Sequence, residues 1–137
     1  MALETWIIDT SAYHRIGNSP DAPLWEGRIH RGLVGITTVT LLEIGFSSRN
    51  TADYFQVFNS AVMSSLVPLG ISLNAERAAM EIQKKLVIRG EHRGPSVSDL
   101  LVAAVAIEAN KTVLHLDKDF ETIRKVAGLT LERVSEV

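Results

Sequence analysis

The chain has 137 residues, of which 46% are hydrophobic and 22% are charged, and its formal net charge is −2. This balance is typical of a globular protein and unlike that of disordered chains, and the length fits one domain over residues 1–137. The absence of cysteine excludes disulfides, thiolate nucleophiles and cysteine-ligated zinc or iron–sulfur centres.

Five short apolar runs predict the strands of a buried sheet. They cover residues 6–9, 33–37, 66–69, 112–116 and 130–134. Short apolar runs bounded by polar or turn-forming residues are typical of strands that are covered on both faces.

Segments with helical periodicity lie between these runs. One apolar stripe from Tyr54 to Leu66 predicts a single surface helix. A cleaner stripe over 75–86 predicts a second, with Asn74 as its N-cap and Gly90 ending it in a left-handed conformation. The next helix, over about 96–110, is apolar on nearly every face and is therefore expected to be buried.

Strands that alternate with helices favour parallel pairing with right-handed crossovers. The sequence therefore predicts an α/β fold, a three-layer α/β/α sandwich with a central parallel sheet. Ligands of such sheets bind outside the carboxyl ends of the strands, so polar residues that follow strands are the first candidates for a functional site.

Acidic residues interrupt the apolar pattern at five positions. Asp9 directly follows the first strand, and Asp117 and Asp119 follow the apolar run VLHL. Glu43 lies within the apolar segment TVTLLEIGF, and Asp99 lies in the first turn of the most apolar helix. If the strands are parallel, these carboxylates meet at one edge of the sheet.

Each acid also has a structural explanation. Asp9 and Asp119 are possible N-caps of the helices that follow them. Asp99 is the third residue after Ser96, which is the spacing of a capping box. Glu43 could pair with Arg15 or Arg49, since a charge in an apolar helix is costly unless it is paired or binds a cation.

Taken together, the acids favour a metal site. Several carboxylates without matching basic residues repel one another, and a divalent cation relieves this repulsion. Because the ligands are all oxygens, the expected ion is Mg²⁺ or Mn²⁺. Such a site suits hydrolysis of a phosphodiester, since the metal acidifies water and neutralises charge on the phosphate.

At these residues the sequence resembles the PIN-domain ribonucleases, and among them the VapC toxins of bacterial VapBC toxin–antitoxin pairs. The resemblance runs through DTSA at 9–12, Glu43, the run SDLLVAAVA that carries Asp99, and DKDF at 117–120. The motifs are specific only together, in this order and at these separations.

The resemblance implies an acidic catalytic quartet of Asp9, Glu43, Asp99 and Asp117, which would also bind the metal, with Asp119 as a fifth ligand. It further implies that a hydroxyl of Thr10 or Ser11 supports the first carboxylate or a metal-bound water. His115 stands where many members carry threonine, a departure that bears on substrate preference more than on activity.

The resemblance also implies partners. VapC-like proteins cut RNA at few sites, commonly in structured transfer or ribosomal RNA, and often form homodimers. A cognate VapB-like antitoxin inhibits them by covering the acidic site with its C-terminal segment. An arginine is the expected inhibitory residue, because its guanidinium matches carboxylates in charge and geometry.

A basic segment, KKLVIRGEHRGPS, immediately precedes the helix of Asp99. Its structural explanation is a solvated helix end with cations near the C-terminal dipole. Its glycines and proline predict a loop near the acidic edge. We expect Arg89, His92 and Arg93 to hold the RNA backbone.

Other motifs are absent or weak. The four histidines lack metal-ligand spacing, and no GxSxG, GxGxxG or P-loop pattern occurs. Trp25, Tyr54, Phe55 and Phe58 are expected in the core or at a dimer surface. Two alternatives stay open: a non-catalytic PIN-like scaffold that binds protein or RNA, and a Mg²⁺-binding receiver-type signalling domain, which would need an acidic pair after the first strand.

The sequence also bears on location. Its longest apolar run, LLVAAVAI, has eight residues, whereas a membrane span needs roughly 20. The N-terminal residues carry Glu4 and Asp9 and lack the basic start of a secretion signal. We therefore expect a cytoplasmic protein with no membrane association.

Overall fold

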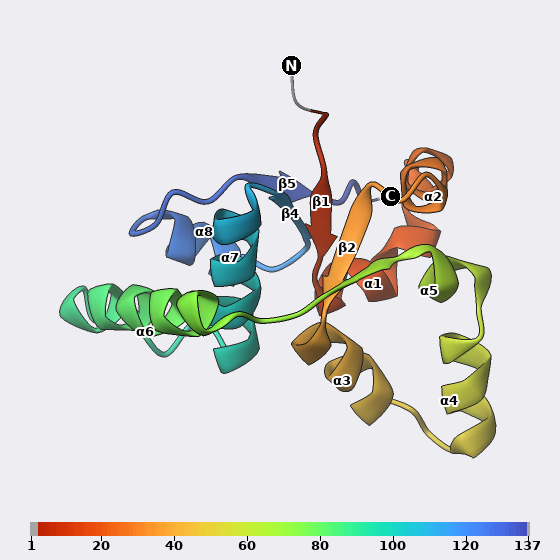
Figure 1. Ribbon diagram of the computed structural model, residues 1–137, viewed down its shortest axis with the longest axis horizontal. Helices are drawn as coiled ribbons and strands as arrows, with labels where there is room; N and C mark the ends of the chain where they lie inside the picture. The colour runs from red at the N-terminus through yellow and green to blue at the C-terminus, as the bar shows by residue number, and fades with distance from the viewer. Residues whose placement is uncertain (1–2, 137) are drawn as a thin grey trace.

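A five-stranded parallel sheet organises the chain in the computed structural model, which describes residues 3–136 (Figure 1). The strands follow the order β3-β2-β1-β4-β5 across the sheet. Their bounds are β1 Trp6–Ile8, β2 Val34–Thr37, β3 Val67–Leu69, β4 Thr112–His115 and β5 Leu131–Arg133. All five predicted strands are confirmed, each within two residues of its predicted limits.

Helices connect the strands and cover both faces of the sheet. In the N-terminal half they are α1 Thr10–Arg15, the 3-10 helix η1 Ile16–Asn18, α2 Ala22–His30, α3 Thr38–Phe46, α4 Thr51–Phe58 and α5 Ala61–Ser65. In the C-terminal half they are α6 Leu73–Ile88, α7 Val97–Ala109 and α8 Asp119–Arg124. No helix in the described part of the chain is long and apolar enough to cross a membrane.

Two apolar cores lie on opposite faces of the sheet, because successive strand residues point in opposite directions. Ile7 and its β4 neighbour Val113 pack against α6, α7 and α8. Ile8 and its neighbour Leu114 pack on the other face with residues of α1, α2 and α3. Figure 1 shows α6, α7 and α8 on one side of the central strands and α1, α2 and α5 on the other. The three-layer α/β/α prediction is therefore confirmed.

The chain order fixes where a site can form. β1 pairs with both β2 and β4, so the crossovers on its two sides run in opposite directions. This reversal leaves a crevice at the carboxyl ends of β1 and β4. Asp9 directly follows β1, and Asp117 lies two residues after β4.

The single helix predicted over 54–66 is wrong. The structure has two helices there, α4 and α5, because the hydroxyl of Ser60 accepts a hydrogen bond from the Met63 N–H at 3.2 Å and begins a new helix. The stacked rings of Tyr54 and Phe58 cover α3 at Gly45, where an added Cβ would lie 3.3 Å from Tyr54.

The helix predicted over 75–86 is confirmed as α6, but its predicted cap is wrong. Ser72 rather than Asn74 is the N-cap, and its hydroxyl accepts from the Ala75 N–H at 3.0 Å. Gly90 has a φ of 72°, as predicted. Hydrogen bonds from Gly90 N to Val87 O and from Glu91 N to Leu86 O, both 2.9 Å, complete this helix end.

Candidate active site

Asp9 lies at the junction of β1 and α1 and is 4% exposed. It is the N-cap of α1, since its Oδ1 accepts from the Ala12 N–H at 2.9 Å, so the structural explanation is confirmed. The Ser11 hydroxyl lies 2.9 and 2.8 Å from the two carboxylate oxygens and accepts from the Leu116 N–H at 3.0 Å. Burial, aided by the charge of Asp117, raises the pKa of Asp9 to about 6.

Asp99 both caps a helix and faces the other acids. Its N–H donates to the Ser96 hydroxyl at 3.1 Å, and its Oδ2 accepts from the Ser96 N–H at 2.9 Å, which completes the predicted capping box. Burial, aided by the charges of Asp117 and Asp9, raises the pKa of Asp99 to about 6. The two roles are therefore compatible in one side chain.

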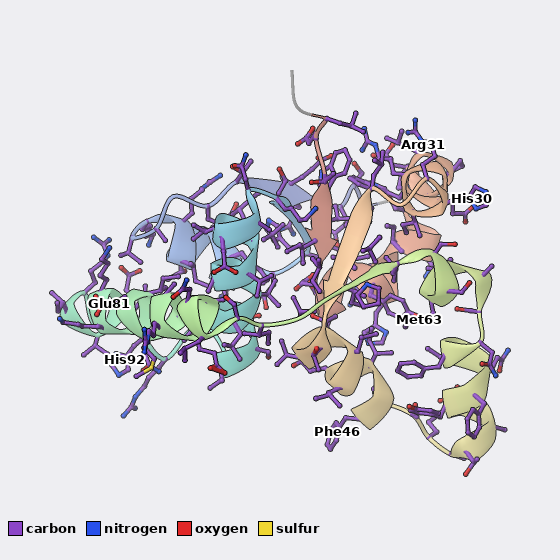
Figure 2. The ribbon with its side chains drawn as sticks, in the orientation of Figure 1. His30, Arg31, Phe46, Met63, Glu81 and His92 are labelled. Atoms are coloured by element: carbon purple, nitrogen blue, oxygen red, sulfur yellow. The ribbon has the colours of Figure 1, made fainter. Side chains whose placement is uncertain are left out.

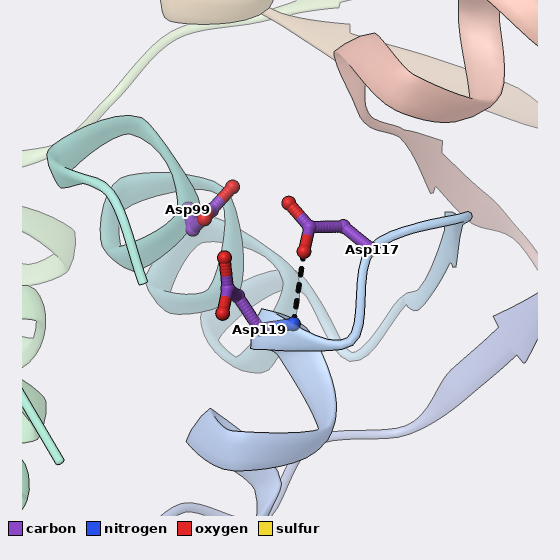
Figure 3. Close-up of side chains that lie close together, drawn as sticks. All are labelled: Asp99, Asp117 and Asp119. Carbon is purple, nitrogen blue, oxygen red and sulfur yellow. Dashed lines mark hydrogen bonds between the residues drawn. The ribbon is translucent and has the colours of Figure 1, made fainter. Parts of the chain in front are cut away.

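Asp117 lies in the turn after β4, and Asp119 is the first residue of α8. Asp117 Oδ1 accepts from the Asp119 N–H at 2.9 Å (Figure 3). The prediction that Asp119 caps the following helix is wrong, because Lys118 occupies that position and Asp119 is the first residue of α8. The freed carboxylate of Asp119 approaches Asp117 instead, and burial together with the charge of Asp117 raises its pKa.

Glu43 is exposed rather than buried, because α3 turns much of its apolar surface outward. It accepts hydrogen bonds from the Thr10 hydroxyl at 2.6 Å and from the Ser98 hydroxyl at 2.9 Å. The predicted arginine partners are wrong, since Arg49 lies 3.6 Å from Asp53 and no ion pair joins Glu43 to Arg15 in residues 3–136. Of the hydroxyls of Thr10 and Ser11, one of which was predicted to support Asp9 or a metal-bound water, that of Ser11 contacts Asp9 and that of Thr10 contacts Glu43.

These side chains line one open cavity of about 330 Å³. Its wall includes all five predicted acids and the two hydroxyl residues after Asp9. Five further residues line it that were not predicted as site residues: His14, Thr40, Ser96, Ser98 and Val102. Within the described chain, no lysine or arginine lines this cavity. The cavity is therefore strongly anionic.

The donor set fits a divalent cation. Asp99, Asp117 and Asp119 each present a carboxylate oxygen, and these atoms lie within 4.8 Å of one another (Figure 3). Carboxylates alone suit hard ions such as Mg²⁺ and Mn²⁺. The pKa values of Asp9 and Asp99 are raised mainly because burial disfavours the charged carboxylates, and neighbouring acids add to this effect, so a bound cation would stabilise the charged forms.

The backbone of the basic segment lies beside the acidic residues. A Cβ at Gly94 would lie 3.2 Å from Asp119 Oδ1, so this loop borders the cavity. His92 and Arg93 are exposed in the same loop, and Figure 2 labels His92. Arg89 pairs with Glu91 at 2.7 Å, and Lys125 also reaches Glu91, which leaves Arg89 less free to contact a phosphate.

His115 is 1% exposed and lies beneath the site rather than in it. Its Nδ1 lies 3.0 Å from the Asp117 carbonyl oxygen and 3.2 Å from the Asp117 nitrogen, so the ring braces the turn that carries Asp117. Burial lowers the pKa of His115. Its burial puts the ring out of contact with a substrate, so any effect on substrate preference acts through Asp117.

Comparisons with known proteins agree with this architecture. A family model for the PIN domain matches residues 6–126. Ribonuclease VapC2 of Mycobacterium tuberculosis (strain CDC 1551 / Oshkosh) is 43% identical over 135 residues, covering 98% of this chain and 96% of that protein. Ribonuclease VapC51 of M. tuberculosis (strain ATCC 25618 / H37Rv) is 33% identical over 128 residues, covering 93% and 90%.

A solved structure shows the same fold at lower identity. A chain of DNA-bound VapBC from Salmonella typhimurium superimposes with a TM-score of 0.76 at 16% identity, covering 96% of this chain and 98% of that one. The chain therefore belongs to the PIN-domain family and, within it, to the VapC ribonucleases. This membership removes the receiver-type alternative.

Proposed function

We propose that this chain is a divalent-metal-dependent endoribonuclease of a toxin–antitoxin pair. Asp9, Glu43, Asp99 and Asp117 are its catalytic acids and, with Asp119, its metal ligands. The observation that carries the proposal is the meeting of three carboxylates within 4.8 Å in a cavity that no lysine or arginine of the described chain lines. The ion is Mg²⁺ or Mn²⁺.

RNA is the proposed substrate because the relatives at 43% and 33% identity are named ribonucleases. When bound, the divalent ion supplies positive charge for the scissile phosphate and acidifies water for attack on phosphorus. Without such a cation the anionic cavity would repel a phosphodiester. The chain's own residues must therefore hold the acids in place before the substrate arrives.

Backbone N–H groups hold three of these acids, Asp9, Asp99 and Asp117. The helix start at Ala12 fixes Asp9, the capping box fixes Asp99, and the α8 backbone fixes Asp117. Each of these bonds forms as the protein folds, so the carboxylates pay little orientational cost when a cation binds. This preorganisation supports a catalytic rather than a purely structural role for the cluster.

We propose that a VapB-like antitoxin inhibits the site by covering it. An apolar cavity of about 520 Å³ adjoins the acidic one and is lined in part by Leu42, Phe46 and Val97, which are 67%, 92% and 69% exposed. Figure 2 shows Phe46 projecting away from α3. A segment with an arginine beside apolar residues would fill both cavities, its guanidinium neutralising the acids.

The direct test is cleavage of cellular RNA by the purified chain in Mn²⁺, in Mg²⁺ and in EDTA. We expect discrete cuts with either metal and none in EDTA. Cleavage that persists in EDTA would contradict metal dependence. Binding of RNA or antitoxin without cleavage under any of these conditions would instead support the non-catalytic scaffold.

A further inference from the structure

Glu43 differs from Asp9, Asp99 and Asp117 in how it is held. No backbone N–H of the described chain donates to it, and its side chain is exposed on α3. A glutamate side chain loses rotamer entropy when it is fixed in one orientation. Its orientation toward the acidic cavity therefore depends on the two hydroxyls that donate to it, those of Thr10 and Ser98.

Ser98 contacts Glu43 from the same helix that carries Asp99. It is the second residue of α7, and its hydroxyl lies 2.9 Å from Glu43 Oε2. Ser96, not Ser98, caps α7, so the Ser98 hydroxyl is not needed to start the helix. The only other side chain within its hydrogen-bond reach among the described residues is Ser96, whose Oγ is 3.1 Å away.

The number of hydroxyl protons determines which group donates in the contact between Ser98 and Glu43. A hydroxyl has one proton to donate. Because a carboxylate can only accept, Ser98 donates to Glu43 and must accept from the Ser96 hydroxyl. Ser96 in turn accepts from the Asp99 N–H. A directed chain of hydrogen bonds thus links the backbone at Asp99 to the carboxylate of Glu43.

We propose that Ser98 is a positioning residue that fixes the Glu43 carboxylate at the metal site. This proposal rests on the metal-dependent activity proposed above. Ser98 lies on α7 next to Asp99, and Glu43 lies on α3. The contact therefore fixes the Glu43 carboxylate relative to Asp99, although the two acids are 56 positions apart in the sequence. Partners that orient metal ligands in this way typically change metal affinity about 10–100-fold when removed.

The test compares Ser98→Ala, which removes the donor, with Ser98→Thr, which keeps a hydroxyl. Ser64→Ala is the matched control, because Ser64 is an exposed helical serine on α5 whose hydroxyl, among residues 3–136, bonds only the Ala61 carbonyl oxygen. Mn²⁺ affinity is measured by calorimetry without RNA, and RNA cleavage is measured separately. We expect Ser98→Ala to weaken Mn²⁺ binding about tenfold. Ser98→Thr and Ser64→Ala should stay within about threefold of the unchanged chain.

A double substitution shows whether Ser98 acts through Glu43. In a Glu43→Gln background, Ser98→Ala should cause no further loss of Mn²⁺ affinity. An equal loss in both backgrounds, or wild-type Mn²⁺ affinity in Ser98→Ala, would overturn the positioning role while leaving the proposed function intact. If the unchanged chain neither binds Mn²⁺ nor cuts RNA, both proposals fall.

Discussion

At the scale of single residues, Asp9 is an acid that folding buries. Its pKa rises from an ordinary value of 3.8 to about 6 because burial disfavours the charged form more than the Ala12 and Ser11 hydrogen bonds favour it. The folded state therefore binds a proton more tightly than the unfolded state. Asp9 therefore destabilises the folded protein progressively as the pH rises from about 4 to about 6. The whole of this destabilisation is present above about pH 6.

Asp9→Asn should consequently stabilise the metal-free protein at neutral pH. Asparagine caps a helix as well as aspartate does, so the change removes the buried charge and keeps the cap. In EDTA, the difference in unfolding free energy between variant and unchanged chain should grow from near zero at about pH 4 to at most roughly 3 kcal/mol at about pH 7. Chemical denaturation across this range measures it, and a difference independent of pH would be inconsistent with a buried charged Asp9.

At the scale of elements, the loop between α6 and α7 places the basic segment next to the acidic cavity. Gly94 borders Asp119, and Arg93 is exposed nearby. Arg93→Glu should weaken RNA binding and lower the slope of log affinity against log salt concentration by about 1. Arg31→Glu is the control, since Figure 2 places Arg31 at α2, away from this loop. Equal effects of the two substitutions on binding would count against a specific contact by the loop.

The end of α6 makes a separate prediction about stability. Gly90 has a φ of 72°, where an added Cβ is strained although nothing lies within 4 Å. Gly90→Ala should lower the unfolding free energy by about 1 kcal/mol. Gly27→Ala, inside α2 with equally open space, should be neutral or stabilising. Denaturant titration of both variants tests this, and equal destabilisation would argue against strain at Gly90.

Elements were predictable wherever pattern and local chemistry agreed. The five strands, the stripe of α6 and the burial of α7 follow from hydrophobic periodicity. Periodicity did not reveal the break between α4 and α5, because the apolar stripe continues across it while the Ser60 hydroxyl starts a new helix. Likewise, whether Ser72 or Asn74 caps α6 depends on where the preceding strand ends. The apolar stripe of α6 does not determine that position.

At the scale of the whole molecule, strand order determines the site. Acids that follow β1 and β4 were expected to meet because parallel strands share a carboxyl edge, and Asp9 and Asp117 do so. The partners of Glu43 were not predictable in the same way. Thr10 and Ser98 are ordinary helix-start residues in the sequence, and only the packing of α1, α3 and α7 brings their hydroxyls to one carboxylate.

The crowded charges also couple metal binding to pH. Protons and a divalent cation compete for Asp9 and Asp99, both with pKa values raised to about 6. Mn²⁺ should therefore raise the midpoint of thermal unfolding more at about pH 7.5 than at about pH 5, because the carboxylates lose their protons between these values. Thermal unfolding at fixed Mn²⁺ concentration measures this, and an equal or larger shift at the lower pH would contradict a carboxylate site.

The most direct test of a metal-dependent nuclease site is RNA cleavage by Asp99→Asn in Mn²⁺. Asparagine can still support the start of α7, so the substitution separates the helix-capping role of Asp99 from its role at the metal. Glu81→Gln on the exposed face of α6 is the control. We expect Asp99→Asn to stay folded and lose at least about 100-fold in cleavage rate, with Glu81→Gln unchanged. Equal cleavage by a folded Asp99→Asn and the unchanged chain would contradict this site.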